Sequence, residues 1–152
     1  MEQVSDALLA IRQTMKLYDQ CLDQVRRRYS LSKLEIVIIS FLHNNPGHDT
    51  AGAVAEMRML SKGNVSRGVD SLTARGLLER LPDKTDRRWV HLRLKPEADP
   101  IVQDIELAAQ HFIALTFSSF TEEDLSRFHD LNRKLANNVR MNLERSTLSH
   151  GE

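Results

Sequence analysis

The chain has 152 residues, of which 41% are hydrophobic and 28% are charged, the composition of an ordinary folded domain. Its 21 basic and 21 acidic side chains cancel, which argues against a protein that coats nucleic acid nonspecifically through a high positive charge. A single cysteine excludes an internal disulfide, and no apolar run approaches the ~20 residues of a membrane span. The first residues also lack the basic and apolar segments of a secretory leader. We therefore expect a cytoplasmic protein without membrane contact.

The first 30 residues carry apolar side chains at alternating spacings of four and three, which predicts a long amphipathic helix. These positions are Val4, Leu8, Ile11, Met15, Tyr18, Leu22, Val25 and Tyr29. Ser32 and Glu35 then have the spacing of a capping box, in which each side chain accepts a hydrogen bond from the other residue's backbone. The segment LEIVIISFL that follows is too apolar to be exposed, and Asn-Asn-Pro-Gly ends it. We expect this second helix to be central.

Residues 50–76 predict two helices joined by a tight turn. Thr50 has the N-cap position of AGAVAEM, and after a bend Ser61 caps a second helix that ends at Gly76. The apolar positions of this second helix repeat at helical spacing and should face the core; they are Val65, Val69 and Leu72. The polar face left to solvent carries Ser61, Lys62, Asn64, Ser66, Arg67 and Ser71. We interpret it as the DNA-reading face, because arginine bonds guanine, asparagine bonds adenine, and small polar groups suit phosphates.

Two short β-prone runs, LLERL and WVHLRL, flank the polar segment PDKTDRR and predict a hairpin, the wing of a winged helix-turn-helix. Lys84, Arg87 and Arg88 stand at its tip, where we expect them to contact DNA, with an arginine in or beside the minor groove. Asp86 belongs to the same candidate site. We expect it to orient the Arg88 guanidinium, because a carboxylate facing phosphate would be repelled.

Residues 97–145 predict two more long helices. The apolar positions of the first are Ile101, Ile105, Ala108, Phe112 and Leu115. Thr121 and Asp124 cap the second, whose apolar positions are Leu125, Phe128, Leu131, Leu135, Val139 and Leu143. Residues 146–152 are expected to form a frayed tail. These helices carry more apolar surface than a small domain covers, so we expect a twofold dimer; the alternative is a monomer whose helical hairpin folds over its own module.

Charge is unevenly distributed along the chain. Residues 61–93 carry eight basic and four acidic side chains, a net charge of +4, whereas residues 97–130 carry eight acidic side chains and one arginine, a net charge of −7. The basic footprint is therefore confined to the helix-turn-helix and the wing, which would orient the protein on DNA.

The segment LSKGNVSRGVDSLTARGLLERLPDKTDRRWVHLRL resembles the recognition helix and wing of the multiple antibiotic resistance regulator (MarR) family of bacterial transcription factors. The family has an Asp-x-Arg at the wing before an alternating strand, which Asp86-Arg87-Arg88 matches. The resemblance implies one mainly α domain over residues 1–152 with a small β-hairpin. Residues 31–95 would form the winged helix-turn-helix, and residues 1–30 and 97–145 the dimerisation helices. The chain departs from the family's usual Leu-Thr at Leu94-Lys95-Pro96, which leaves the start of the next helix open.

The same resemblance implies a sequence-specific transcription regulator that binds a pseudo-palindromic operator as a homodimer, in particular a repressor relieved by a small-molecule effector. Effectors in the family commonly bind where the helical body meets the winged domain. Tyr18, His43 and His111 are our candidates to line that cleft, because they offer polar groups among apolar neighbours. The alternatives are a winged-helix module that docks on protein, and a regulator gated by metal or redox state.

The sequence contains little that indicates a catalytic, cofactor-binding or metal-binding site. Ser30-Leu-Ser-Lys33 fits the Ser-x-x-Lys pattern of some acylating enzymes but has no companion motif, and no glycine-rich phosphate loop occurs, so we expect neither an enzyme nor a cofactor. The six histidines include no pair at the i, i+4 spacing of metal ligands on one helix face. Zinc-sensing members of the family cluster such ligands around the helix after the wing, where only His111 stands here. Cys21 lies well after the sensor position of the peroxide-sensing branch, which falls near Leu8.

Overall fold

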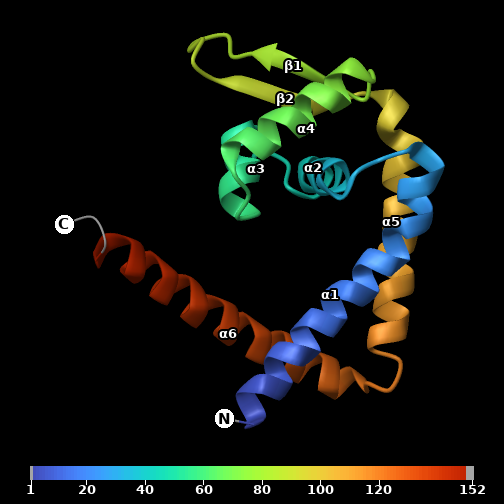
Figure 1. Cartoon of the computed structure of the whole chain (residues 1–152), viewed down its shortest axis with the longest axis vertical. Coiled ribbons are helices and arrows are strands. Elements are labelled where there is room, and N and C mark those ends of the chain that lie inside the picture. Colours follow the sequence, from blue (N-terminus) through green and yellow to red (C-terminus); the bar gives the residue numbers. More distant parts are fainter. Residues whose placement is uncertain (1, 150–152) are drawn as a thin grey trace. The chain divides into compact units, whose positions relative to one another are not determined.

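The computed structural model of the chain describes residues 2–149, and their fold is mainly helical with an antiparallel hairpin (Figure 1). The elements are α1 (Glu2–Tyr29), α2 (Lys33–Asn44), α3 (Ala51–Met57), α4 (Lys62–Ala74), β1 (Leu78–Pro82), β2 (Val90–Leu94), a 3-10 turn (Pro96–Ala98), α5 (Asp99–Thr116) and α6 (Glu122–Ser149). The expected fold class is thus confirmed. The chain divides into two compact units, residues 1–112 and residues 113–152. None of the described helices is long and apolar enough to cross a membrane.

The core of the first unit forms around α2, as its apolar sequence predicts. Its start is the expected capping box: the backbone N–H of Glu35 donates to Ser32 Oγ at 3.1 Å, and the backbone N–H of Ser32 donates to Glu35 Oε2 at 2.7 Å. The helix then buries the side chains of Ile36, Ile38, Ile39 and Phe41. α4 packs on one side of α2 and is followed by the hairpin, so the core positions the predicted DNA-reading elements (Figure 1).

α1 divides into a buried half and an exposed half. Leu22 and Val25 lie in the core, whereas the apolar side chains nearer the N-terminus, such as Leu8 and Met15, are more than half exposed. α5 begins at Asp99 after the 3-10 turn, which answers the question left open by Leu94-Lys95-Pro96. A proline suits the first position of such a turn because its missing N–H would have no helical partner there.

In the second unit, α6 begins with the expected cap. The hydroxyl oxygen of Thr121 accepts the backbone N–H of Asp124 at 3.1 Å, and the Asp124 carboxylate accepts the backbone N–H of Thr121 at 3.0 Å. Phe117, Phe120 and Phe128 pack edge to face around the turn before α6. The expected frayed tail is wrong for residues 146–149, because no glycine or proline interrupts the sequence there and helix propagates to Ser149. Residues 150–152 lie outside the described part of the chain.

Candidate nucleic-acid interface

The helix-turn-helix is built from the local signals in the sequence. Thr50 Oγ1 accepts the backbone N–H of Ala53 at 3.1 Å, and Ser61 Oγ accepts the backbone N–H of Asn64 at 3.2 Å, so both predicted N-caps are confirmed. The turn between them reverses the chain through Met59, whose φ of 53° is left-handed. Gly76, with φ of 71°, ends the second helix in the left-handed conformation that glycine adopts without steric cost.

α4 lies very close to α2 along its buried face. Val65, Val69 and Leu72 are at most 1% exposed, as their spacing predicts. Between them Gly68 faces α2 without a side chain, which permits the close approach. Because a helix docked along this face exposes the opposite one, the polar positions of α4 are turned outward.

The exposed face of α4 holds the side chains that the sequence assigns to DNA. Ser61, Lys62, Asn64, Ser66 and Arg67 are all exposed. The Arg67 guanidinium donates a hydrogen bond to Asn64 Oδ1, one helical turn away. The two candidates for base contacts therefore form a pair on the same part of the surface, and their interaction orients the guanidinium.

Ser71 is placed differently from the other candidates. Its hydroxyl donates to Glu35 Oε1 at 2.7 Å, so this group connects α4 to α2. Arg75 extends the connection: it pairs with the same carboxylate at 3.6 Å and donates to the carbonyl oxygens of Tyr29 and Ser30 at the end of α1. Burial acts to raise the pKa of Glu35, but the hydrogen bonds from Ser32 and Ser71 hold it below its usual range. Ser71 is exposed like the other candidates, but its hydroxyl is also engaged in the packing of α4 on α2.

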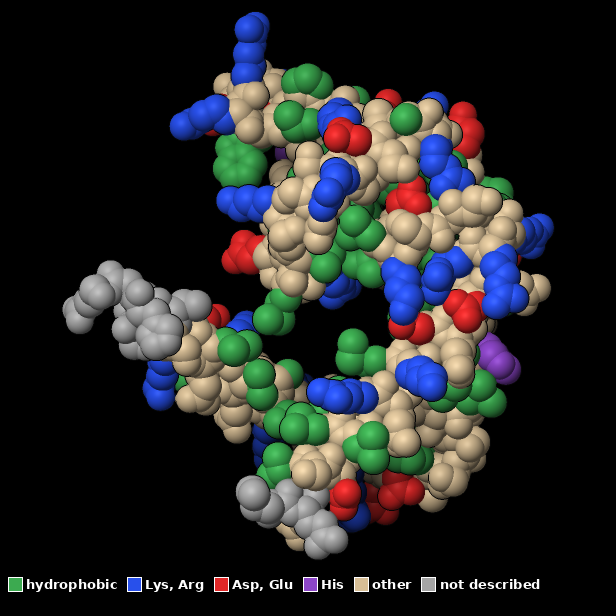
Figure 2. All heavy atoms as spheres, in the orientation of Figure 1, with side chains coloured by type: hydrophobic (Ala, Val, Ile, Leu, Met, Phe, Trp, Pro, Cys, Tyr) green, Lys and Arg blue, Asp and Glu red, His purple; other side chains and the backbone are tan. Residues whose placement is uncertain are grey.

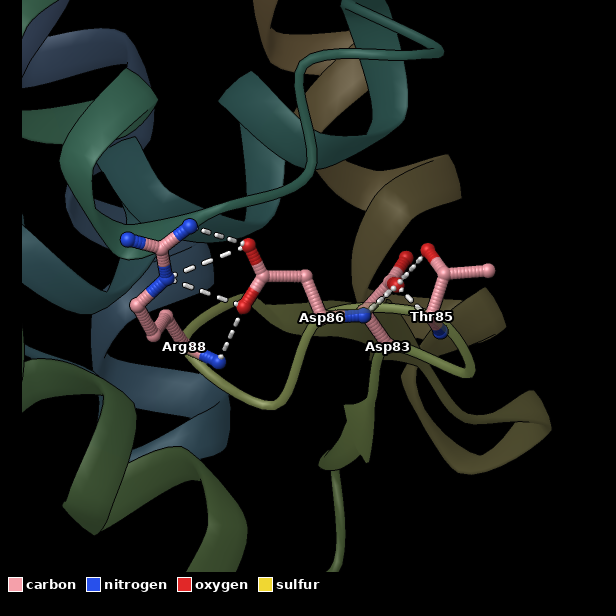
Figure 3. A network of polar contacts seen from close by, with 4 residues as sticks. All are labelled: Asp83, Thr85, Asp86 and Arg88. Carbon is pink, nitrogen blue, oxygen red and sulfur yellow. Dashed lines mark hydrogen bonds and ion pairs between the residues drawn. The ribbon is translucent and has the colours of Figure 1, made fainter.

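The wing is held by its register and by hydrogen bonds at its tip. β1 and β2 pair from Leu78 with Leu94 to Pro82 with Val90. At the tip, Asp83 Oδ1 accepts the backbone N–H groups of Thr85 and Asp86, each at 2.8 Å, and the hydroxyl of Thr85 at 2.7 Å (Figure 3). These bonds fix the path of the turn that presents the basic residues.

Asp86 orients Arg88, as the sequence predicts. The Arg88 guanidinium donates to both oxygens of the Asp86 carboxylate, at 2.7 Å from its terminal nitrogen and 3.0 Å from Nε, and the Arg88 backbone N–H donates at 3.0 Å (Figure 3). These bonds hold the pKa of Asp86 below its usual range. Arg88 nonetheless remains 87% exposed, and Lys84 and Arg87 are exposed beside it. Figure 2 shows Lys and Arg side chains extending from the tip of the hairpin.

The sequence reasoning missed one residue of the wing, His91 of β2. Its Nδ1 lies 2.8 Å from Asp49 Oδ1 and its Nε2 lies 2.9 Å from Asp83 Oδ2. The alternation in WVHLRL places His91 on the side of the strand opposite the buried Leu92, but its partners are 8 and 42 residues away. Only the strand pairing and the docking of the hairpin bring them together.

The three effector candidates do not share a cleft. Tyr18 lines a cavity of about 360 Å³ between α1 and α2, whereas His111 lines a separate hollow between α1 and α5. His43 is exposed and pairs with Glu106 at 2.8 Å. The residue of α5 that contacts Tyr18 is Phe112, whose ring packs edge to face on it. His111 precedes Phe112, so its side chain is rotated by about 100° around the helix axis, away from Tyr18. The expected grouping of these residues is therefore wrong.

The Tyr18 cavity combines apolar walls with cationic groups. Leu22, Ile36 and Val37 supply apolar surface. Three basic residues, Arg26, Lys33 and Arg58, also line the cavity, together with the acidic Asp19. Among the described residues, Arg26 Nε and Ser40 Oγ are buried without a hydrogen-bond partner, and both residues line this cavity. Both atoms are inaccessible to solvent, so a ligand in the cavity would contact other atoms of its lining side chains.

No metal centre is assembled within the part of the chain that the structure describes. None of its His, Cys, Asp and Glu side chains form a group of three or more that could hold a metal ion. The two carboxylates at His91 bond opposite nitrogens of one ring, so the three side chains do not converge on a point. Cys21 is a free, half-buried thiol in the hollow that His111 lines.

Comparisons with known proteins agree with this geometry. Residues 29–88 match the sequence profile of the MarR family. The uncharacterized HTH-type transcriptional regulator YsmB of Bacillus subtilis (strain 168) is 25% identical over 140 residues, which cover 92% of this chain and 95% of YsmB. A MarR family protein from Bacillus stearothermophilus has a similar fold, with a TM-score of 0.73 at 21% identity over 91% of this chain and 96% of its own. Bordetella bronchiseptica BpsR, whose DNA binding is regulated by 6-hydroxynicotinic acid, has a TM-score of 0.68 at 22% identity over 88% of this chain and 98% of its own.

Proposed function

Because this chain belongs to the MarR family of transcription regulators and carries its DNA-binding winged helix, we propose that it binds a pseudo-palindromic operator as a homodimer and represses transcription until a small effector releases it. Members of this family are transcription regulators and not enzymes. The observation that carries the proposal is the combination, in one module, of an exposed polar face on α4 with a basic wing tip held by hydrogen bonds.

The DNA contacts follow from the positions of these side chains. α4 enters the major groove, where Arg67 and Asn64 read base edges and Ser61, Lys62 and Ser66 contact phosphates. The wing lies along the neighbouring minor groove. Arg88, held by Asp86, and the exposed Arg87 and Lys84 supply its positive charge.

The exposed apolar side chains of the long helices support the homodimer. The first half of α1 leaves Val4, Leu8 and Ile11 about half exposed or more, and α6 does the same with Leu131, Leu135 and Val139. Rows of this kind are typical of surfaces buried between subunits. A twofold pair would set two α4 helices about 34 Å apart, one turn of DNA, which matches a pseudo-palindromic operator.

The effector in this proposal is a small acid with a flat apolar body, bound in the Tyr18 cavity. The volume of about 360 Å³ falls within the usual range for small-molecule sites. Lys33 pairs with Asp19 and Arg26 pairs with Asp23, so Arg58 is the cation proposed to attract a carboxylate, and the apolar walls would hold a ring. Arg58 is the C-cap of α3 at the turn before α4, so a ligand that draws it inward would displace the reading helix. The effector of BpsR, 6-hydroxynicotinic acid, has this chemistry.

The wing arginines provide the test. A mobility shift is titrated with salt on the promoter fragment of the chain's own gene, for the wild type and for the double variant Arg87→Ala, Arg88→Ala. The expected result is weaker binding to promoter and random DNA alike. The log–log salt slope should be flatter by roughly one unit for each phosphate that the variant no longer neutralises.

The matched control is Arg127→Ala, Arg133→Ala, which removes two exposed arginines from α6 in the second unit. Its salt slope should equal that of the wild type. If the wing variant binds with unchanged affinity and slope, the hairpin is not a DNA wing, and a role in docking on protein replaces the proposal.

A further inference from the structure

His91 joins two parts of the DNA-binding module through both nitrogens of its ring. Asp49, which accepts from Nδ1 at 2.8 Å, lies in the loop just before α3. Asp83, which accepts from Nε2 at 2.9 Å, begins the turn of the wing. The carbonyl oxygen of Asp49 also accepts the backbone N–H of Leu92 at 2.6 Å, so the loop is fastened to β2 beside the histidine.

The chemistry of the ring sets its protonation state. A neutral imidazole has one N–H and one lone pair, whereas an imidazolium has two N–H donors. Both partners of His91 are carboxylates, which are acceptors when ionised, so both hydrogen bonds exist only when the ring is protonated. The titratable groups that face the ring are Asp49 and Asp83, and its register partner on β1 is the uncharged Leu81. Hydrogen bonds to Asp49 and Asp83 raise the pKa of His91.

The His91 bridge continues to the DNA-contacting end of the wing. While Oδ2 of Asp83 bonds His91, its Oδ1 accepts the three hydrogen bonds that shape the tip, including the one from the Asp86 backbone. Asp86 in turn holds the Arg88 guanidinium. The side chain that presents charge to DNA is thus connected, through two carboxylates and one imidazolium, to the loop before α3.

We propose that protonated His91 is a positioning residue that holds the wing in its DNA-contacting orientation, so that removal of its proton weakens DNA binding. The inference rests on the wing contact proposed above. When the ring is neutral, one nitrogen lone pair faces a carboxylate oxygen at hydrogen-bonding distance. That contact is repulsive, and one end of the bridge opens.

The direction of the pH dependence follows from the raised pKa of His91. The ordinary histidine pKa is about 6.5, and below it the ring is protonated in the folded and the unfolded chain alike. The bridge therefore contributes fully in that range and is lost as pH rises through the higher pKa of the folded chain. Its hydrogen bond to His91 lowers the pKa of Asp83, which stays ionised throughout this window. DNA affinity should consequently fall as the pH rises through this raised pKa of His91.

The first experiment follows the ring itself by nuclear magnetic resonance of the full-length protein. Long-range ¹H–¹⁵N spectra report the protonation of each histidine nitrogen. Asp49→Asn removes one carboxylate and keeps the size of the side chain, and Asp130→Asn on α6 is the matched control. In the wild type, the titration midpoint of His91 should lie above about 6.5, and both ring nitrogens should carry protons below that midpoint. Asp49→Asn should lower this midpoint, and Asp130→Asn should leave it unchanged.

The second experiment measures binding of a labelled mixed-sequence duplex by fluorescence anisotropy at constant low salt, because phosphate contacts of the wing need no operator. Wild-type affinity should decline several-fold across the pH range in which His91 titrates. Asp49→Asn should move this decline to lower pH, whereas Asp130→Asn should not. His91→Gln, which stays neutral, should bind weakly without this decline. The remaining histidines are present in every variant, so only a change in the profile counts.

Two results would overturn the inference. One is a His91 midpoint at or below the ordinary value, which would mean that no bridge exists. The other is a raised His91 midpoint that Asp49→Asn lowers while the pH profile of DNA binding stays that of the wild type, which would separate the bridge from DNA contact. Failure of the wing contact itself is recognised independently, by unchanged binding of the Arg87→Ala, Arg88→Ala variant at one pH.

Discussion

Gly68 of α4 faces Ile38 of α2 so closely that a β-carbon at position 68 would lie 2.5 Å from Ile38 Cδ1 and 3.2 Å from Leu34. Ile38 is fully buried, so its methyl group has little room to move away. α4 can therefore pack this closely on α2 only because residue 68 has no side chain. Its orientation toward DNA depends on that contact.

The seating of α4 can be measured with two alanine substitutions in the same helix. Gly63→Ala meets no atom within 4 Å and should stabilise the protein by up to about 1 kcal/mol through helix propensity. Gly68→Ala gains the same propensity but overpacks the contact with Ile38, and should be less stable than Gly63→Ala by about 1–3 kcal/mol. Urea unfolding of both variants gives the difference. Equal stabilities would show that α2 yields to the added methyl group.

Base reading by Arg67 should differ from phosphate contact by Lys62. Arg67→Ala should cost about 1–3 kcal/mol on the operator and relax specificity, because alanine cannot form the bidentate hydrogen bonds to a base edge. Lys62→Ala should weaken operator and random DNA to the same extent. Competition of a labelled operator with scrambled DNA measures the specificity ratio. An unchanged ratio for Arg67→Ala would exclude this side chain from base readout.

The dimer proposal predicts that two lysine substitutions on α6 have different effects on the oligomeric state. Leu135→Lys places a charge in the exposed apolar row and should shift the protein toward monomer, because burying an unpaired charge between subunits is costly. Asn137→Lys, two positions along the helix and turned to another side, should remain a dimer. Light scattering of both variants gives their mass. Leu135 is 55% exposed in the single chain, so dissociation of the dimer need not unfold it. A stable dimer of Leu135→Lys would remove this row from the interface.

The effector site proposed in the Tyr18 cavity predicts selectivity for aromatic acids. Calorimetric titration with 6-hydroxynicotinate and related aromatic carboxylates should show binding that weakens about tenfold or more in Arg58→Ala, as expected when a charge-assisted hydrogen bond is removed. Arg12→Ala, on the exposed part of α1, is the control and should bind as the wild type. Carboxylate binding that is equally strong in Arg58→Ala, Lys33→Ala and the wild type would place the effector elsewhere.

The sequence by itself determined the elements of this protein, because their signals are local. Ser32 with Glu35, Thr50, Ser61 and Gly76 mark helix ends through bonds or backbone angles that involve residues only a few positions apart. The repeat of apolar residues likewise identified the faces of α4 and α2 that are buried. The Asp86–Arg88 pair was also predictable, since its members are two residues apart.

Only the tertiary structure decided which distant side chains meet. The hydroxyl of Ser71 points to Glu35, 36 residues away, although its position on the helix pattern matched that of a DNA contact. His91 reaches Asp49 only because the hairpin folds back beside the loop before α3. The repeat of apolar residues indicates which face of a helix or strand is buried, but not which other element packs against it. The direction of a polar side chain at the edge of a face is therefore set by long-range packing, which brings together partners that local sequence does not relate.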